Sequence, residues 1–375
     1  MGEWGVLMTI PIFWMGSTDQ NAVITISASL HCTYHVCHRH KCLTCSPSPS
    51  PDRTAWAVTP RKKLHLQHPR LSEYRDRPEY FRRCLRMVVG GERAGVKMER
   101  YDGEETTGGV YFMLDKAGTP LAVFKPAGEE AGVTGGAAPR RGIAPGAGAR
   151  REYAVSFLAA AAGQRCPVTA LVTARPNGGV PQVGALQEYV PSVGSCTDYG
   201  PGRFAAESAA DVMLLDLRFL NTDRHLGNLL MHEDNSITPI DHTYCLPTTL
   251  DEIWYSWLSW PQARSPFPRK FRDQVLHCDL LADVAFLRSV DIEAEAVFNY
   301  FLANLVLKAA LLAGASPYDL GRFFSRLTLE EPSKLEVLHS DVLEVFPHAV
   351  RDPGSCAGSL AAYVSSRLPF GDPRP

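Results

Sequence analysis

Three polar residues in the middle of the chain have a spacing suited to phosphoryl transfer. Asp223 and Asn228 lie in the segment Asn-Thr-Asp-Arg-His-Leu-Gly-Asn, and Asp241 follows after a short turn between two apolar runs. An Asp-x4-Asn pair can supply a polar group near an attacking hydroxyl and a Mg²⁺ ligand, and a later Asp can hold Mg²⁺ against a triphosphate. Each residue alone could be a loop cap. Because hard oxygen ligands suit Mg²⁺, the three in this order predict a phosphotransfer site.

A lysine and a glutamate precede these residues in the order that the same chemistry needs. Lys125 stands at the end of a predicted strand, Val-Phe-Lys-Pro, where its ammonium could reach nucleotide phosphates. Glu152 begins the next predicted helix and is the natural ion-pair partner of Lys125. Alone, such a lysine is usually solvated, and such a glutamate usually just favours the helix dipole. Their place ahead of Asp223 favours the functional interpretation.

Short strands precede helices along the chain. Residues 108–113 and 120–125 predict a β-hairpin with its turn at 115–118, and residues 183–190 predict another strand. Residues 127–149 are rich in Gly, Ala, Pro and Arg without periodicity, which predicts a mobile loop.

Helical patterns follow this loop. An amphipathic helix can begin near Arg150, an apolar stripe predicts a helix over 211–220, and residues 295–312 predict a long helix that ends at Gly314. Ser316, followed by a proline, is the expected N-cap of a further helix. Strands first and helices later predict an α+β protein of two unequal lobes.

Several strings of the sequence together resemble the phosphoinositide 3/4-kinase superfamily. They are 108–113 (Gly-Gly-Val-Tyr-Phe-Met), 123–126 (Val-Phe-Lys-Pro), 187–191 (Gln-Glu-Tyr-Val-Pro), 223–228 (Asp-Arg-His-Leu-Gly-Asn), 240–242 (Ile-Asp-His) and 257–263 (Trp-Leu-Ser-Trp-Pro-Gln-Ala). The last string and residues 244–247 (Tyr-Cys-Leu-Pro) look like plant-type gamma phosphatidylinositol 4-kinases. The resemblance implies a two-lobed, protein-kinase-like catalytic domain that uses ATP and Mg²⁺.

The resemblance also implies roles for individual residues. ATP would be bound by Gly108, Gly109, Lys125, Glu152, Gln187, Glu188, Tyr189 and Val190. Asn228 and Asp241 would bind the metal, and Asp223 or His225 would assist the substrate hydroxyl. Histidine has the more suitable ordinary pKa for a base, while the aspartate occupies the place of the protein-kinase residue. A third alternative is that His225 only orients the loop.

The expected substrate class follows from the resemblance and from one segment in which this sequence lacks basic residues. No Lys or Arg stands between Asp241 and Arg264, where a pocket for a multiply phosphorylated inositol would want basic residues. We therefore expect a 1-phosphatidylinositol 4-kinase that acts on unphosphorylated phosphatidylinositol. The alternatives are a protein Ser/Thr kinase of the same fold and a catalytically weak nucleotide-binding scaffold.

Composition limits the partners and the setting. A net charge of −2 and a pI near 6.6 predict no nucleic-acid binding, and no apolar run approaches the roughly 20 residues of a transmembrane segment. Any membrane contact is therefore expected to be peripheral. Ten cysteines fall short of a disulfide scaffold, which favours a cytoplasmic setting. Residues 61–100 hold 12 Lys/Arg against 5 Asp/Glu, an excess of +7. This segment either contacts anionic lipid or forms a helix with Tyr80, Phe81, Leu85 and Val88 facing inward.

The predicted organisation has five parts. They are an extension with a Ser-Pro linker (1–58), the basic segment (59–100), an N-lobe (101–190), a C-lobe (191–332) and a C-terminal helical tail (333–375). The extension holds a Cys/His tract over 31–45, which predicts either a disordered tail or a zinc site. The tryptophans Trp254, Trp257 and Trp260 are expected to pack in the core rather than to stack on substrate.

Overall fold

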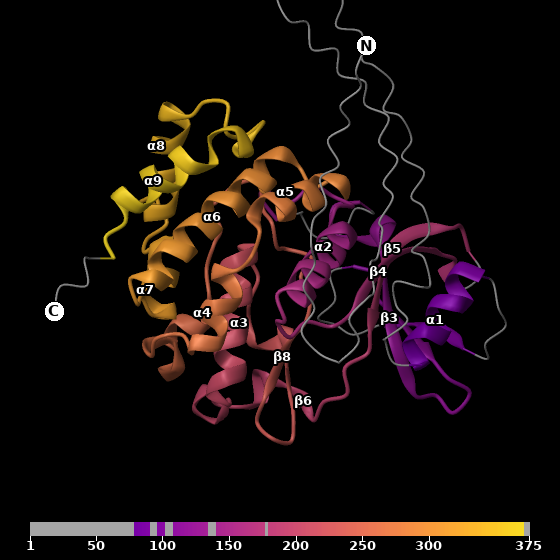
Figure 1. Ribbon diagram of the computed structural model, residues 1–375. Coiled ribbons are helices and arrows are strands. Elements are labelled where there is room, and N and C mark those ends of the chain that lie inside the picture. The colour runs from indigo at the N-terminus through magenta and orange to yellow at the C-terminus, as the bar shows by residue number, and fades with distance from the viewer. Residues whose placement is uncertain (1–78, 91–95, 102–107, 134–139, 177–178, 371–375) are drawn as a thin grey trace, which may run out of the picture. The chain divides into compact units, whose positions relative to one another are not determined.

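A computed structural model describes residues 79–90, 96–101, 108–133, 140–176 and 179–370, all within one unit that spans residues 65–375 (Figure 1). The predictions for the Cys/His tract, the Ser-Pro linker and the first part of the basic segment lie outside the described residues.

The first part of the described chain forms a five-stranded antiparallel sheet in the order β1-β2-β3-β5-β4. Its strands are β1 (Lys97–Arg100), β2 (Tyr111–Leu114), β3 (Pro120–Pro126), β4 (Thr169–Ala174) and β5 (Gln182–Glu188). The predicted hairpin is confirmed as β2 and β3, with Asp115 accepting hydrogen bonds from the backbone of Ala117 and Thr119 in the turn. The predicted strand at 183–190 is β5, whereas β1 and β4 were not expected.

Helix α1 (Glu79–Gly90) covers one face of this sheet (Figure 1). Phe81, Cys84 and Leu85 are fully buried, and they pack in one cluster with Phe124 of β3 and other apolar side chains of the sheet. Val88 is half-buried against the same cluster. The prediction of a helix packed on the lobe is therefore confirmed for this part of the basic segment, while the Tyr80 side chain lies outside the described residues.

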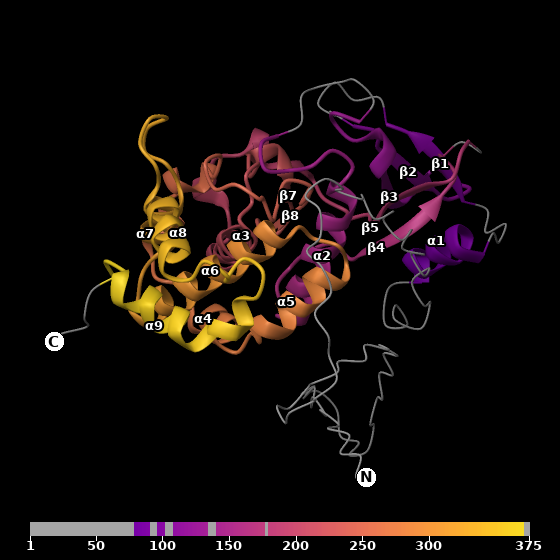
Figure 2. The ribbon, with the colours of Figure 1, turned by 90° about the horizontal axis from the view of Figure 1, so that it is seen from above.

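Helix α2 (Gly148–Ala161) lies on the opposite face of the sheet, against β4 and β5 (Figure 2). It begins close to the expected Arg150. Its apolar side chains, among them Val155 and Leu158, belong to the larger core of the helical lobe and not to the cluster beneath α1. Helix α2 therefore joins the two cores, which lets a side chain on α2 reach both the sheet and the helical lobe.

The helical lobe contains a small antiparallel sheet, β6-β7-β8, and seven helices among its described residues. The strands are β6 (Gly194–Ser195), β7 (Leu229–Met231) and β8 (Ile237–Pro239). The helices are α3 (Ala206–Phe219), α4 (Arg269–Leu276), α5 (Leu280–Ser289), α6 (Ala294–Leu312), α7 (Pro317–Phe324), α8 (Lys334–Val345) and α9 (Ala357–Arg367). The predicted helix at 211–220 begins earlier, because α3 includes the turn before Asp211.

Helix α6 runs through the core of this lobe and ends as predicted. Gly314 has a φ of +79°, the left-handed conformation that glycine adopts without strain after a helix. Ser316 then caps α7 in a capping box with Asp319. Among the described helices, α6 alone has the length and hydropathy to cross a bilayer, but 72% of its apolar window is buried by protein. It therefore has the character of a core helix.

The expectation that all three tryptophans pack in the core was wrong for one of them, and the predicted loop at 127–149 lies partly outside the described residues, which omit 134–139. Trp257 and Trp260 are buried as predicted, but the Trp254 side chain is 59% exposed, because the segment between two buried residues turns it outward. The described parts of the loop at 127–149 are held by specific contacts. Glu130 accepts hydrogen bonds from the backbone of Gly148 and Ala149 at the start of α2, and the Gly142 carbonyl accepts one from Thr248 (2.8 Å).

Candidate active site

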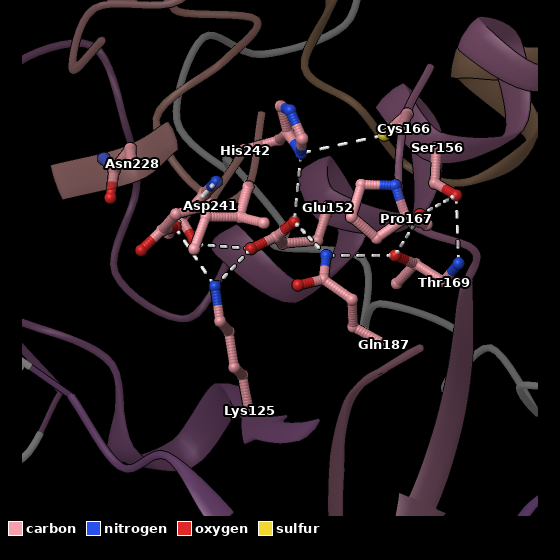
Figure 3. A network of polar contacts seen from close by, with 12 residues as sticks. Lys125, Glu152, Ser156, Cys166, Pro167, Thr169, Gln187, Asn228, Asp241 and His242 are labelled. Carbon is pink, nitrogen blue, oxygen red and sulfur yellow. Dashed lines mark hydrogen bonds and ion pairs between the residues drawn. The ribbon is translucent and has the colours of Figure 1, made fainter. Parts of the chain in front are cut away.

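Lys125 reaches from the sheet into a cluster of polar side chains that includes Glu152 of α2 and Asp241 after β8 (Figure 3). Its Nζ atom is 2.6 Å from Oε1 of Glu152 on α2 and 3.2 Å from Oδ1 of Asp241. Alternation along β3 buries Phe124 on the α1 face and turns Lys125 to the α2 face. The pair predicted from the sequence, Lys125 with Glu152, is thus formed in the structure.

Both members of this pair are charged at neutral pH. Burial alone would lower the pKa of Lys125, but the carboxylates of Asp241 and Glu152 outweigh it and raise that pKa above its ordinary value. Burial would likewise raise the pKa of Glu152. Lys125 and the hydrogen bond from His242 reverse this effect and hold the pKa of Glu152 below its usual range. The site therefore presents a fixed cation beside two carboxylates.

Besides Lys125, other side chains also contact the Glu152 carboxylate (Figure 3). Gln187 donates its amide N–H to Oε2 at 3.2 Å, and Nδ1 of His242 lies 3.5 Å from the same oxygen. Thr243 donates its hydroxyl to Oε1 at 3.3 Å. Groups from β5 and from the segment after β8 thus orient one buried carboxylate, which in turn orients Lys125.

The segment 187–190, which the resemblance implies binds ATP, contacts both Glu152 and the neighbouring strands. The Gln187 side chain is buried and faces Glu152 and Thr169, because the register of β5 with β4 turns it toward α2. The backbone N–H groups of Glu188 and Tyr189 donate to the carbonyls of Val168 and Leu121. These N–H groups are therefore engaged in holding the sheet, and Gln187 acts on Glu152.

The loop that carries Asp223 is anchored by a buried ion pair. The Nε–H of Arg224 is shared between the two carboxylate oxygens of Asp216 on α3, at 2.9 and 3.1 Å, and both side chains are fully buried. Nη1 of Arg224 donates to the carbonyls of Asn228 (2.6 Å) and Ile240 (2.9 Å). One guanidinium therefore joins α3 to both ends of the β7-β8 hairpin, from which the expected metal ligands project.

Asp216 has further partners in this anchor. It accepts hydrogen bonds from Asn221 (3.1 Å) and from the indole N–H of Trp257 (3.0 Å). Sequence reasoning missed both Asp216 and Arg224. The available signal was an aspartate inside the apolar run Val-Met-Leu-Leu-Asp-Leu, since a charged residue on a buried helix face needs a partner.

Asp223 and His225 differ in what their atoms can do. The ring Nδ1 of His225 accepts a hydrogen bond from the backbone N–H of Gly227 (3.1 Å), so in the neutral ring Nε2 carries the proton. That tautomer has no basic lone pair toward Asp223, whose Oδ2 lies 3.9 Å from Nε2. Burial raises the pKa of Asp223, and Arg140 and His225 offset this only in part. The contacts favour His225 as a residue that orients the loop.

The two expected metal ligands lie at the joined ends of β7 and β8. Asn228 precedes β7 and Asp241 follows β8, and the backbone N–H of Ile240 donates to the Asn228 carbonyl at 3.0 Å. The Asn228 amide N–H donates to the Asp223 carbonyl (3.1 Å), which orients its side chain. Asp241 has a φ of +55°, a conformation uncommon outside glycine that concentrates at functional sites.

Gly108 and Gly109 lie against the short turn that follows β3. The backbone N–H of Gly109 donates to the Glu129 carbonyl at 3.0 Å, and a Cβ on Gly109 would meet Oε2 of Glu129 at 2.2 Å. The Glu129 carboxylate is itself held by the hydroxyl of Tyr111 and the amide of Gln182. A side chain at position 109 would therefore displace the Glu129 side chain from these partners.

Comparison with known proteins agrees with this arrangement. The family model described as "Phosphatidylinositol 3- and 4-kinase" matches residues 138–313, which include Glu152, Asp223, Asn228 and Asp241. This region of the chain is therefore similar to that kinase family. Lys125 and the first strands of the sheet lie before the matched range.

Two plant proteins are among the relatives that this chain resembles. Phosphatidylinositol 4-kinase gamma 4 of Oryza sativa subsp. japonica is 34% identical over 296 residues, covering 71% of this chain and 51% of the relative. Phosphatidylinositol 4-kinase gamma 4 of Arabidopsis thaliana is 29% identical over 327 residues, covering 78% and 57%. The chain spans about half the length of these relatives.

A solved MAP kinase from Leishmania major matches with 13% identity and a TM-score of 0.28, covering 78% of this chain and 85% of that chain. This likeness is too low to support the fold assignment. The two-lobed kinase fold rests instead on the family match, the two separate cores and the antiparallel sheet with α2 behind it.

Proposed function

We propose that this chain is an ATP- and Mg²⁺-dependent phosphotransferase that phosphorylates the inositol ring of phosphatidylinositol at the 4-hydroxyl. The observation that carries the proposal is Lys125 between Glu152 and Asp241, a cation fixed by one carboxylate and presented beside a second. Phosphoryl transfer depends mainly on neutralising the phosphates and on positioning the hydroxyl in line, and this site has groups for both.

Each residue then has a role that its contacts support. Lys125 binds the α- and β-phosphates, and Glu152 orients it. Asp223 accepts the hydrogen bond of the attacking hydroxyl, because the Nδ1 lone pair of His225 is engaged by Gly227. His225 orients the loop.

The donor set fits Mg²⁺. Asn228 and Asp241 offer an amide and a carboxylate oxygen from adjoining strand ends, and Mg²⁺ is commonly held by one or two protein groups together with substrate phosphates. No cluster of three or more His, Cys, Asp or Glu in the described residues could hold a metal by itself, which is consistent with a metal that arrives with the nucleotide. When bound there, Mg²⁺ would neutralise charge on the phosphates.

The lipid substrate is proposed from the names of the relatives, which are phosphatidylinositol 4-kinases. Such an enzyme works at a membrane surface, so we propose a cytoplasmic protein with peripheral membrane contact. Helix α1 packs on the sheet, and vesicle co-sedimentation would test for contact between its arginines and lipid. Binding that rises with anionic lipid, falls with salt and drops when Arg82, Arg83 and Arg86 become Gln would support it.

The test of the reaction is transfer from γ-labelled ATP, with phosphatidylinositol vesicles in one reaction and a generic protein substrate in another, each with Mg²⁺ or with excess chelator. We expect Mg²⁺-dependent label in the lipid, and separation of the monophosphate isomers should identify the 4-phosphate. Label in protein but never in lipid would replace the lipid substrate with a protein hydroxyl. Nucleotide binding without transfer to any acceptor would favour a scaffold.

A further inference from the structure

Arg140 reaches from the segment before α2 to the loop that carries Asp223. Its Nη1 donates to the Thr222 carbonyl at 2.5 Å, and its Nη2 contacts Oδ1 of Asp223 at 2.5 Å. Its guanidinium carbon lies 5.2 Å from the centroid of the Tyr244 ring, within range of a cation–π contact. One side chain thus holds a backbone carbonyl, a carboxylate and an aromatic face, which fixes its own orientation.

Arg140 contacts only one of the two carboxylate oxygens of Asp223. Oδ1 is bound by Arg140, whereas Oδ2 faces Nε2 of His225 at 3.9 Å, beyond hydrogen-bond distance. A rigid guanidinium on one oxygen restricts rotation of the carboxylate and presents the second oxygen to an incoming hydroxyl. The planar fork of arginine suits this double contact, and the single ammonium of lysine would reproduce only part of it.

The segment around Arg140 is itself fixed to the chain that follows Asp241. The Thr248 backbone N–H and hydroxyl both donate to the Gly142 carbonyl, at 2.8 and 3.1 Å. Gly142 has a φ of +74°, and a Cβ there would meet Oγ1 of Thr249 at 2.7 Å, so glycine permits this close approach. The neighbouring Arg141 side chain is 69% exposed, so its ion pair with Asp251 (2.5 Å) adds little to this anchor. Arg140 therefore acts on Asp223 from an anchored position.

We propose that Arg140 is a positioning residue of the phosphotransfer site, which holds the Asp223 carboxylate in the orientation that accepts the substrate hydroxyl. This inference rests on the proposed function and adds to it a residue outside the loops that carry Asp223, Asn228 and Asp241. Arg140 acts through Asp223 and has no direct role toward ATP, so its loss should change turnover and leave nucleotide binding unaffected.

The experiment compares steady-state transfer to phosphatidylinositol vesicles by the full chain and its Arg140→Gln, Arg140→Lys, Arg141→Gln, Asp223→Asn and Arg140→Gln/Asp223→Asn variants. We expect Arg140→Gln to lower kcat by about 10- to 100-fold, as misplacement of a reacting group does, with KM for ATP within about twofold of wild type. Arg140→Lys should recover part of the loss. Arg141→Gln, which removes a neighbouring cation of equal charge, should stay within about twofold of wild type, as surface changes usually do.

The double variant separates positioning from a general structural effect. If Arg140 acts through Asp223, Arg140→Gln should cause no further loss in the Asp223→Asn background, because residues that act as a unit are not additive. Additive losses, an equal loss from Arg141→Gln, or an Arg140→Gln effect confined to KM for ATP would overturn the proposal. Should Arg140→Gln fail to fold, Arg140→Lys carries the same cycle. Wild-type protein that transfers phosphate to no acceptor would defeat the proposed function, and this inference with it.

Discussion

The side chains of Lys125 and Asp241 form an ion pair, with Nζ 3.2 Å from Oδ1. Lys125 comes from the sheet and Asp241 from the end of β8, and Glu152 on α2 holds Lys125 from a third direction at 2.6 Å. In the proposed reaction, Asp241 would bind the metal and Lys125 would contact the phosphates. Loading of Mg²⁺ with ATP would therefore exchange this ion pair for contacts with the ligand.

The first prediction concerns Asp241 as a metal ligand. We expect Asp241→Ala to lower kcat by more than about 10²-fold, because the metal supplies much of the charge stabilisation. Asp241→Asn should lose similar activity with a smaller loss of stability, since asparagine tolerates the left-handed backbone better than alanine. Steady-state kinetics with circular dichroism measures both. Asp198→Ala, at an exposed turn, is the control, and near-wild-type turnover by Asp241→Ala would refute the assignment.

The second prediction orders Lys125 and Glu152. We expect Lys125→Met to reduce kcat/KM for ATP by about 10²-fold and Glu152→Gln to reduce it less, since the lysine contacts phosphate and the glutamate orients the lysine. Glu152→Gln should also lower the melting temperature, because it alters a buried carboxylate that Lys125, His242 and Gln187 all contact. A larger kinetic loss in Glu152→Gln than in Lys125→Met would reverse the two roles.

The third prediction concerns the anchor of the loop that carries Asp223. Asp216→Asn leaves the fully buried guanidinium of Arg224 without a counter-charge, which should lower the free energy of unfolding by about 3–5 kcal/mol. Chemical denaturation would measure the loss. As a matched control, Asp273→Asn removes an exposed pairing with Arg269 and should change stability by about 0.5 kcal/mol or less. Equal effects of the two substitutions would contradict a buried anchor.

The fourth prediction is a pH dependence of stability from Asp211 on α3. Burial raises the pKa of Asp211 from its ordinary 3.8 to about 6, and a hydrogen bond from the backbone N–H of Arg165 (2.8 Å) offsets burial only in part. The folded state therefore binds this proton more tightly than the unfolded state. The protonated carboxyl favours folding below pH 4, and this contribution is lost as the pH rises to 6.

Asp211→Asn removes that titration while its amide oxygen can still accept the Arg165 hydrogen bond. We expect the variant to be more stable than wild type by about 1–2 kcal/mol at pH 7 and the difference to vanish below pH 4. Unfolding curves across pH 3.5 to 7.5 would show this. A variant that is less stable at pH 7, or a difference that does not change with pH, would contradict the expectation.

The order in which the site residues occur along the chain, and much of the local structure, could be predicted from the amino-acid sequence. The β2-β3 hairpin, the left-handed Gly314 that follows α6 and the capping box at Ser316 depend on residues within a few positions of one another, so the amino-acid sequence predicts them directly. The pairing of Lys125 with Glu152 was predictable because a lysine on a strand and a glutamate at the start of the next helix, in that order, match a known phosphate-binding arrangement.

The tertiary structure alone decided which distant groups meet and which way side chains face. Arg140 and Asp223 are 83 positions apart, and the contact between them depends on how the segment before α2 packs against the loop that carries Asp223. The face to which Gln187 turns follows from the register of β5, since a shift of one residue would reverse it. Trp254 is exposed although Ile253 and Tyr255 on either side of it are buried. Residue types and spacing determine which chemistry is available, but long-range docking determines which atoms come within bonding distance.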